Sequence, residues 1–221
     1  MSNELLFFLQ IITVFGSVLG ALILGKEALV ACISFLFVIA NLFVIKQISV
    51  FGLNVTPTDV YIIGGVLGFN FLQEFYGKKI AEKTIWISFL VSLIFVVMSR
   101  IHVWFAPNVH DVTHGLFVKV LGFLPRIAIA SFIAHVVAQY FRLFFYGFLK
   151  KIFINRYLIT RNLTVTVIEQ ALDTALFSFI GLYGIVYSLR DVFLLSFSVK
   201  LITIMCTIPA IVLARFFVRR G

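Results

Sequence analysis

The sequence predicts an all-α integral membrane protein, a polytopic bundle of about seven transmembrane helices, and three observations support this fold class. First, 62% of the 221 residues are hydrophobic and 12% are charged, with a mean hydropathy of +1.13, whereas a soluble domain usually has about 45–50% apolar and about 25% charged residues. Second, apolar runs recur with the length of about 20 residues that is needed to cross about 30 Å of hydrocarbon. Third, basic residues gather in alternate connections between these runs. We therefore expect residues 1–221 to form a single integral membrane domain.

The apolar runs that are long enough to span a bilayer follow one another with short connections. They cover residues 5–25, 28–45, 58–76, 84–105, 126–149, 164–188 and 192–217. The connection after the second run, "KQISVFGLNVTPTD", contains Gly52 and Pro57, which favour a turn over a helix. The longest connection, residues 106–125, is too short for a soluble domain. An alternative also fits, in which the first two runs form a helical hairpin and leave six spans with one interfacial helix.

Basic residues are placed as an alternating path through the membrane requires. They follow the third and fifth runs and end the chain: Lys78, Lys79, Lys83, Lys150, Lys151, Arg156, Arg161, Arg215, Arg219 and Arg220. The other connections hold few, such as Lys119 and Arg190. Because Lys and Arg collect in cytoplasmic loops, we expect the N-terminus outside and the C-terminus in the cytoplasm. This rule also explains the net charge of +9 without a nucleic-acid partner. The N-terminus lacks the basic leader of a signal peptide, so we expect the first span to be retained.

Patterns typical of enzymes and metal centres are weak in this sequence. The connection "HVWFAPNVHDVTHG" contains His102, His110, His114 and Asp111. A metal site is conceivable there, but the spacing matches no zinc pattern, and we favour a polar external loop. Both cysteines lie inside apolar runs and indicate no disulfide framework. Nucleophile–base pairs and Walker-type loops are absent from the sequence, so we expect neither enzymatic activity nor a cofactor.

Polar residues inside the apolar runs are the strongest functional signal. An acidic group deep in a spanning helix costs about 2.5–3.5 kcal/mol on insertion scales, so such groups normally face the bundle interior or a cavity. In three runs the polar residues share one helix face at steps of three or four. These are Asn70 with Glu74, His135 with Gln139 and Arg142, and Thr166 with Gln170 and Asp173. Asn41 in the second run and Lys200 in the seventh add to the set.

Several helices deliver these polar groups to a similar depth. At about 1.5 Å per residue from each cytoplasmic helix end, Asn70, Arg142 and Asp173 lie roughly 10–13 Å into the membrane. Three others lie higher, near or past the midplane: Asn41, His135 and Lys200. This clustering at one slab predicts a polar pocket rather than the continuous polar stripe of a channel. Within it, Asn41, Gln139 and Gln170 are the better ligand candidates, because an amide offers donors and acceptors at a lower desolvation cost than a charge.

Structural interpretations compete with the pocket for several of these residues. Arg142 and Asp173 could neutralise each other as a buried pair. Glu74 lies within one turn of "YGKK" and could extend to the cytoplasmic surface. Glu169 faces away from Thr166 on its helix, which favours a structural role.

Four stretches carry a family resemblance. They are "NFLQEFYGKKIA", "RIAIASFIAHVVAQ", "TVTVIEQALDTALFSFIGLYG" and a Lys followed nine residues later by a Pro, namely Lys200 and Pro209. In this order they resemble the queuosine precursor transporter family of vitamin-uptake-transporter-like membrane proteins, over about four-fifths of the chain from Asn41 onward. The resemblance implies uptake of a 7-deazaguanine, such as 7-cyano-7-deazaguanine or 7-aminomethyl-7-deazaguanine, for queuosine in tRNA. It also implies a multi-pass bundle in the bacterial inner membrane, in which many members have six spans and the N-terminal span here would be additional.

Most polar positions match the usual residues of that family. The matching residues are Asn41, Glu74, Tyr76, Gly77, Arg126, Gln139, Thr166, Gln170, Asp173 and Lys200. Three positions depart from it: Asn70 and Arg142 stand where Asp is usual, and Val165 where Ser is usual. Two acids have thus become an amide and a cation. A changed ligand, such as the finished base queuine, is one hypothesis that follows.

The resemblance suggests how the ligand would be held. Asp173 or Glu74 would accept hydrogen bonds from the two N–H donors on the guanine-like edge, and Gln139, Gln170 and Asn41 would complete the contacts. Phe or Tyr rings would stack on the base. Two other functions stay open. One is a binding subunit for another vitamin or nucleobase, which would need an ATP-hydrolysing partner because this chain has no nucleotide-binding motif. The other is a scaffold whose buried charges set helix registry.

Overall fold

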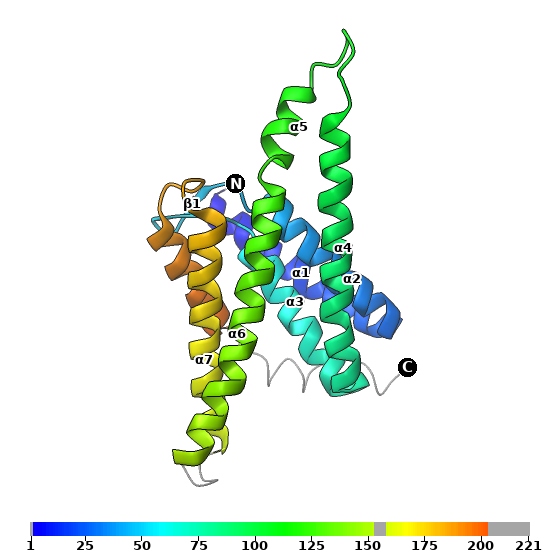
Figure 1. Cartoon of the computed structure of the whole chain (residues 1–221). Helices are drawn as coiled ribbons and strands as arrows, with labels where there is room; N and C mark the ends of the chain where they lie inside the picture. Colours follow the sequence, from blue (N-terminus) through cyan, green and yellow to red (C-terminus); the bar gives the residue numbers. More distant parts are fainter. Residues whose placement is uncertain (1, 153–157, 203–221) are drawn as a thin grey trace.

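The chain forms a bundle of α-helices with a small β-hairpin at one end, as seen in a computed structural model that describes residues 2–152 and 158–202 (Figure 1). The elements follow in the order α1 (Asn3–Leu24), α2 (Lys26–Phe43), β1 (Ile48–Val50), β2 (Leu53–Val55), α3 (Asp59–Phe71), η1 (Leu72–Tyr76), α4 (Lys78–Trp104), α5 (His114–Leu121), α6 (Leu124–Ile152), α7 (Leu158–Phe177) and η2 (Ser178–Leu182). Residues 189–202 are also helical, and the rest of the last predicted run lies outside the described residues. The all-α fold class is confirmed.

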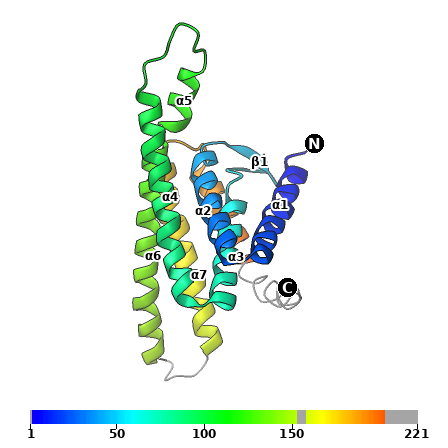
Figure 2. The same ribbon diagram turned by 90° about the vertical axis from the view of Figure 1, so that its right-hand side faces the viewer.

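The helices form two groups that meet at α2. One is the α1–α2–α3 group, in which each helix packs on the other two, and the other is the α6–α7 pair, which lies side by side. Helix α2 also contacts α4 and α6. Figure 2 shows α1 at the edge of the molecule, with α2 and α3 between it and the long helices α4, α6 and α7. Residues 189–202 contact both groups, since Lys200 bonds Asp173 on α7 and Ser196 bonds Asp59 on α3.

Five described segments are long and apolar enough to cross a membrane by length and composition. They are Asn3–Leu24, Lys26–Phe43, Lys78–Trp104, His114–Ala138 and Thr164–Leu182. The third predicted run is not among them, because α3 ends at Phe71 and continues as the π-helical segment η1. The seven-span topology with the N-terminus outside stays a prediction.

The connection at residues 106–125 contains a helix that was not predicted from the sequence. Helix α5 occupies His114–Leu121 within it, and α6 follows after a short turn. Asp111 Oδ1 accepts hydrogen bonds from the backbone N–H of Thr113 at 2.8 Å and of His114 at 3.0 Å, which orders the chain just before α5. The helix forms because the stretch after His114 is apolar apart from Lys119.

The connection after α2 folds into an antiparallel hairpin that the sequence analysis did not predict. Val50 pairs with Leu53, so the turn between the strands has two residues, Phe51 and Gly52. Their φ angles of 52° and 77° are both positive, which is the geometry that matches the twist of a two-residue hairpin. The hairpin packs against residues 189–202, since Val50 and Val55 join Leu195 in one apolar cluster.

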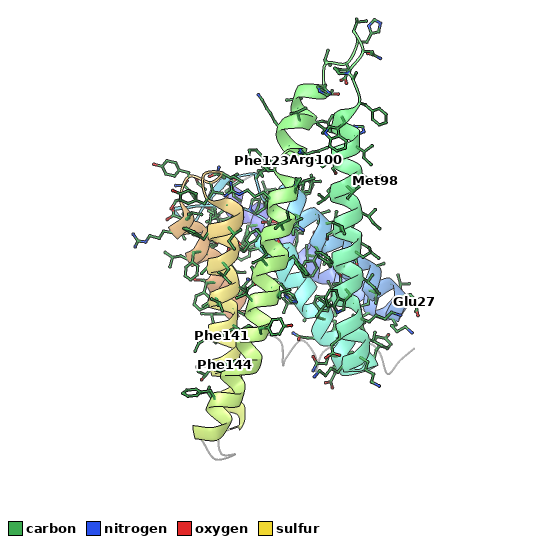
Figure 3. All side chains as sticks on the ribbon, in the orientation of Figure 1. Glu27, Met98, Arg100, Phe123, Phe141 and Phe144 are labelled. Atoms are coloured by element: carbon green, nitrogen blue, oxygen red, sulfur yellow. The ribbon has the colours of Figure 1, made fainter. Side chains whose placement is uncertain are left out.

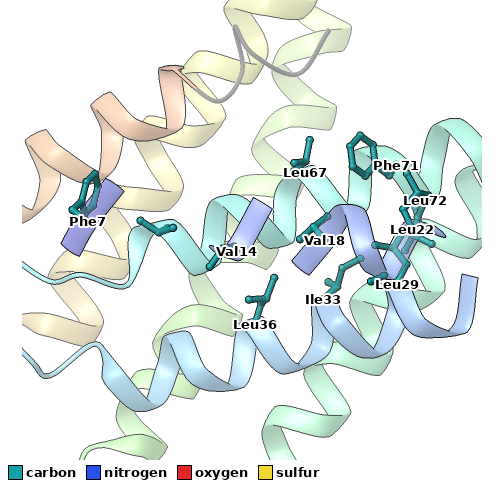
Figure 4. Close-up of a cluster of buried hydrophobic side chains, with 13 residues drawn as sticks. Phe7, Val14, Val18, Leu22, Leu29, Ile33, Leu36, Leu67, Phe71 and Leu72 are labelled. Atoms are coloured by element: carbon teal, nitrogen blue, oxygen red, sulfur yellow. The ribbon is translucent and has the colours of Figure 1, made fainter. Parts of the chain in front are cut away.

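The main apolar core fills the interior of the α1–α2–α3 group (Figure 4). Val18, Leu29, Ile33 and Phe71 are fully buried there. In α3, Gly64 and Gly68 lie one turn apart and face core residues of α1 and α2, so that a side chain at either position would meet them. Small residues at such a spacing allow helices to pack closely within a membrane.

Large apolar side chains also cover the outside of the bundle. Figure 3 shows Met98 on α4 and Phe144 on α6 pointing away from the helices, and their exposed fractions are 57% and 75%. Trp86 on α4 and Phe35 on α2 are each 63% exposed. Such a surface would be unfavourable in water, and it suits contact with lipid chains.

Candidate functional site

An ion pair between Lys200 and Asp173 forms the centre of the candidate site. Lys200 lies on the helical segment 189–202 and Asp173 on α7. Lys200 Nζ lies 2.8 Å from Asp173 Oδ2 and 2.9 Å from Thr174 Oγ1. The Lys200 side chain is only 9% exposed, and that of Asp173 is 25% exposed. Two residues of the predicted set therefore contact each other directly in the interior.

This contact shows that a difference in depth along the helices does not keep Lys200 and Asp173 apart. The sequence analysis placed Lys200 higher in the membrane than Asp173, yet the two charged groups meet. A Lys side chain carries its ammonium on a flexible four-carbon stem, so the charge can lie about a helical turn away from its Cα. Among the described residues, the cationic partner of Asp173 is therefore Lys200. The alternative pairing of Asp173 with Arg142 is not tested, because the Arg142 side chain lies outside the described residues.

Two further helices present polar groups to the same region. His135 on α6 lies within electrostatic range of both Asp173 and Lys200. One turn earlier on α6, Ser131 Oγ donates a hydrogen bond of 3.0 Å to Asn41 Oδ1 on α2. Asn41 is 8% exposed and therefore buried. The polar region thus links α2, α6, α7 and residues 189–202.

Asp59, the first residue of α3, extends the cluster in the other direction. It is buried, and its Oδ2 accepts a hydrogen bond of 2.8 Å from Ser196 Oγ. Asp59 also lies within electrostatic range of Lys200. This residue was not predicted from the sequence because an acid at the start of a helix is common, since it is favoured there by the helix dipole.

Ser178 is a second residue that the sequence analysis missed. Its Oγ is buried and has no hydrogen-bond partner among the described residues. It lies one turn beyond Thr174, at the start of the π-helical segment η2. Buried hydroxyls are normally hydrogen-bonded, and π-helical segments often occur at functional sites, so Ser178 is a good candidate for a ligand contact. The step of four from Thr174 is the signal that could have found it.

The other predicted residues are distributed around this cluster. Gln170 is half-buried on α7, and its backbone carbonyl accepts a hydrogen bond of 2.7 Å from Thr174 Oγ1. Asn70 is half-buried near the end of α3, whereas Glu74 is exposed on η1. Gln139 and Arg142 belong to α6, but their side chains lie outside the described residues. Roles in ligand binding for all of these residues stay predictions.

The His-containing loop before α5 is organised by hydrogen bonds to Asp111. Besides the two backbone N–H groups, Asp111 Oδ1 accepts a hydrogen bond from Thr113 Oγ1 at 2.8 Å. The donors of Thr113 are the main cause that lowers the pKa of Asp111 below its usual value. Within the described residues no group of three His, Cys, Asp or Glu side chains is placed to hold a metal ion.

A cavity of about 380 Å³ opens at the hairpin end of the bundle. Its wall comes from the start of α1, the end of α2, β1 and the start of α3, and it includes Phe7, Gln10, Lys46 and Tyr61. Pro57 also lines it, two residues before Asp59. The cavity is within the usual size range of small-molecule pockets.

Comparisons with known proteins identify the family. The family described as "Putative vitamin uptake transporter" matches residues 60–214, which is more than half of the chain and includes Asp173 and Lys200. This chain belongs to the vitamin uptake transporter family. The "Probable queuosine precursor transporter" of Bacillus subtilis (strain 168) is 31% identical over 189 residues, which are 81% of this chain and 82% of that relative. The resemblance found in the sequence is therefore confirmed.

Membership of the vitamin uptake transporter family agrees with the structure. With five apolar segments of spanning length, this member of the family is a multi-pass membrane protein. The family implies transport rather than enzymatic catalysis. No solved structure matches the chain.

Proposed function

We propose that this protein imports a 7-deazaguanine across the bacterial inner membrane, either a queuosine precursor or queuine, for queuosine in tRNA. The observation that carries the proposal is the similarity to the Bacillus subtilis protein named "Probable queuosine precursor transporter", which extends over 81% of the chain. The buried polar cluster around Asp173 and Lys200 supports it, because it offers groups that a neutral, flat heterocycle could bind inside an apolar bundle.

The chemistry of the cluster suits the hydrogen-bonding edge of a guanine-like base. That edge presents a carbonyl acceptor, a ring N–H and an exocyclic amine. The Asp173 carboxylate could accept from both donors, while an amide such as that of Gln170 could donate to the carbonyl. The Ser178 hydroxyl, which has no partner among the described residues, is available as one more contact. Asn41, Gln139 and Gln170 remain proposed contacts.

Transport of another vitamin or nucleobase is the second candidate, because the family description names vitamins in general. The departures at Asn70 and Arg142 favour a ligand that differs from the usual one within the queuosine group. Complementation separates these possibilities. A bacterium that cannot make the precursor would express this chain and receive each deazaguanine in turn, and queuosine in its tRNA would be scored. Restoration by a precursor or queuine supports the proposal, and restoration by none of them contradicts it.

Asp173→Asn tests the assigned role of the carboxylate. We expect uptake of labelled deazaguanine to fall by about tenfold or more, the value of one hydrogen bond to a charged group. Glu82→Gln is the matched control, because it makes the same change at an exposed acid on α4 whose side chain is 58% exposed. The control should transport at the wild-type rate. Undiminished uptake by Asp173→Asn at a normal protein level would remove Asp173 from the binding site.

A further inference from the structure

Lys200 lies near two acids that belong to different helix groups, the half-buried Asp173 and the buried Asp59. Asp173 on α7 contacts it at 2.8 Å. Asp59 on α3 is within its electrostatic range and accepts a hydrogen bond of 2.8 Å from Ser196. Ser196 and Lys200 are four residues apart and therefore share one face of the helical segment 189–202. One helix face thus presents a cation to the α6–α7 pair and a hydroxyl to the α1–α2–α3 group.

We propose that Lys200 is shared between these acids, so that a substrate bound at Asp173 displaces Lys200 toward Asp59. This inference rests on the proposed function, because it takes Asp173 as the acceptor for the N–H donors of the base. It assigns Asp59 as a positioning residue for transport, acting through Lys200 rather than through contact with the substrate.

Competition for the Asp173 carboxylate favours the displacement. Lys200 and the two donors of a guanine-like edge require the same acceptor group, and Lys200 already bonds Oδ2. A buried ammonium that lost its partner without a replacement would be strongly unfavourable. Asp59, which lies within electrostatic range of Lys200, supplies the replacement, and the four-carbon Lys stem is flexible enough to turn toward it. His135 is the third described titratable side chain near Lys200.

The displacement would link substrate binding to the contacts between the two helix groups. With Lys200 at Asp173, residues 189–202 are held to α7 of the α6–α7 pair. With Lys200 at Asp59, the same segment is attracted to α3 of the α1–α2–α3 group. The hairpin, which precedes α3 directly, packs on Leu195 and Val199 of this segment. A substrate at Asp173 can thereby bias how the two groups and the hairpin end contact each other.

Two conservative substitutions at the Asp59–Ser196 contact test the inference, because they have opposite expected effects. Asp59→Asn removes the negative charge of the second acid, so Lys200 stays on Asp173 and the dissociation constant for labelled 7-cyano-7-deazaguanine should rise by about tenfold. Ser196→Ala removes the donor to Asp59, which then attracts Lys200 more strongly, so the dissociation constant should fall by about threefold. Binding would be measured on the full-length protein purified in detergent.

A merely structural contact would respond differently. If the Asp59–Ser196 contact only held helices together, both substitutions would weaken binding and lower the thermal unfolding temperature. Weaker binding by Ser196→Ala, or an unchanged affinity in Asp59→Asn, would overturn the inference. The proposed function would stand in either case, provided that the wild-type protein binds the labelled base. Absence of binding by the wild type, for this probe and for queuine, would instead overturn the proposed function and the inference together. If Asp59→Asn does not accumulate, Ser196→Ala still tests whether the dissociation constant falls or rises, since this variant leaves every charge in place.

Discussion

Lys200→Met should lower the free energy of unfolding by about 3 kcal/mol, a typical cost of removing one partner from a buried ion pair. The substitution keeps a similar volume but leaves the Asp173 carboxylate without the ammonium at 2.8 Å. It also removes the donor to Thr174 Oγ1. The loss would appear as a lower thermal unfolding temperature in detergent, or as poor accumulation in the membrane.

Two companion variants separate the charge effect from the loss of the Lys side chain. Lys78→Met makes the same change in an ion pair on α4, Lys78–Glu82, whose side chains are 76% and 58% exposed. It should change stability by less than about 0.5 kcal/mol, as exposed pairs usually do. The double variant Lys200→Met/Asp173→Leu replaces both charges with apolar groups and should recover most of the stability. A double variant as unstable as Lys200→Met alone would mean that packing of the Lys stem, not the ion pair, stabilises the interior.

The site was predictable from the sequence only in part. Spacing at steps of three and four singled out Asp173, and Lys200 was apparent as a cation inside an apolar run. Their contact could not be read from spacing, because it depends on how residues 189–202 pack against α7. Asp59 was missed because it follows a connection between two apolar runs, where a charged side chain has a low desolvation cost. Ser178 was missed because a single hydroxyl is a weak signal in an apolar run.

The fold was more predictable than the site. Apolar length and composition correctly predicted the α-helical bundle and the segments α1 and α2 to within about two residues, whereas α4 begins at Lys78, before the predicted run. The hairpin was missed, although "ISV" and "LNV" flank a two-residue turn, because a short turn signal between two membrane runs resembles any connection. The π-helical ends of α3 and α7 depend on tertiary packing, and no sequence pattern indicated them.

Two pairs of glycines have the same spacing in the sequence but different packing in the structure. Gly16 and Gly20 on α1 and Gly64 and Gly68 on α3 have the same four-residue spacing. In the structure, a Cβ atom at Gly16 or Gly20 would meet nothing within 4 Å. A Cβ atom at Gly68 would lie 2.6 Å from Ile33 Cγ1 and 2.9 Å from Ile33 Cδ1. The same motif is therefore a close helix contact in α3 and an open surface in α1.

Gly68→Ala should destabilise the protein by about 1–3 kcal/mol, the usual cost of overpacking a well-filled core. Ile33 is fully buried and packed among the α1–α2–α3 core residues, so it cannot move aside without displacing its neighbours. Gly20→Ala is the matched control and should leave stability unchanged or raise it by up to about 1 kcal/mol, because Ala is the better helix former. Thermal unfolding of both purified variants in one detergent provides the comparison. Equal stability of the two variants would show that α3 does not approach α2 as closely as the contact with Ile33 requires. The α1–α2–α3 group would then not be packed tightly enough to hold Asp59, the first residue of α3, in a fixed position.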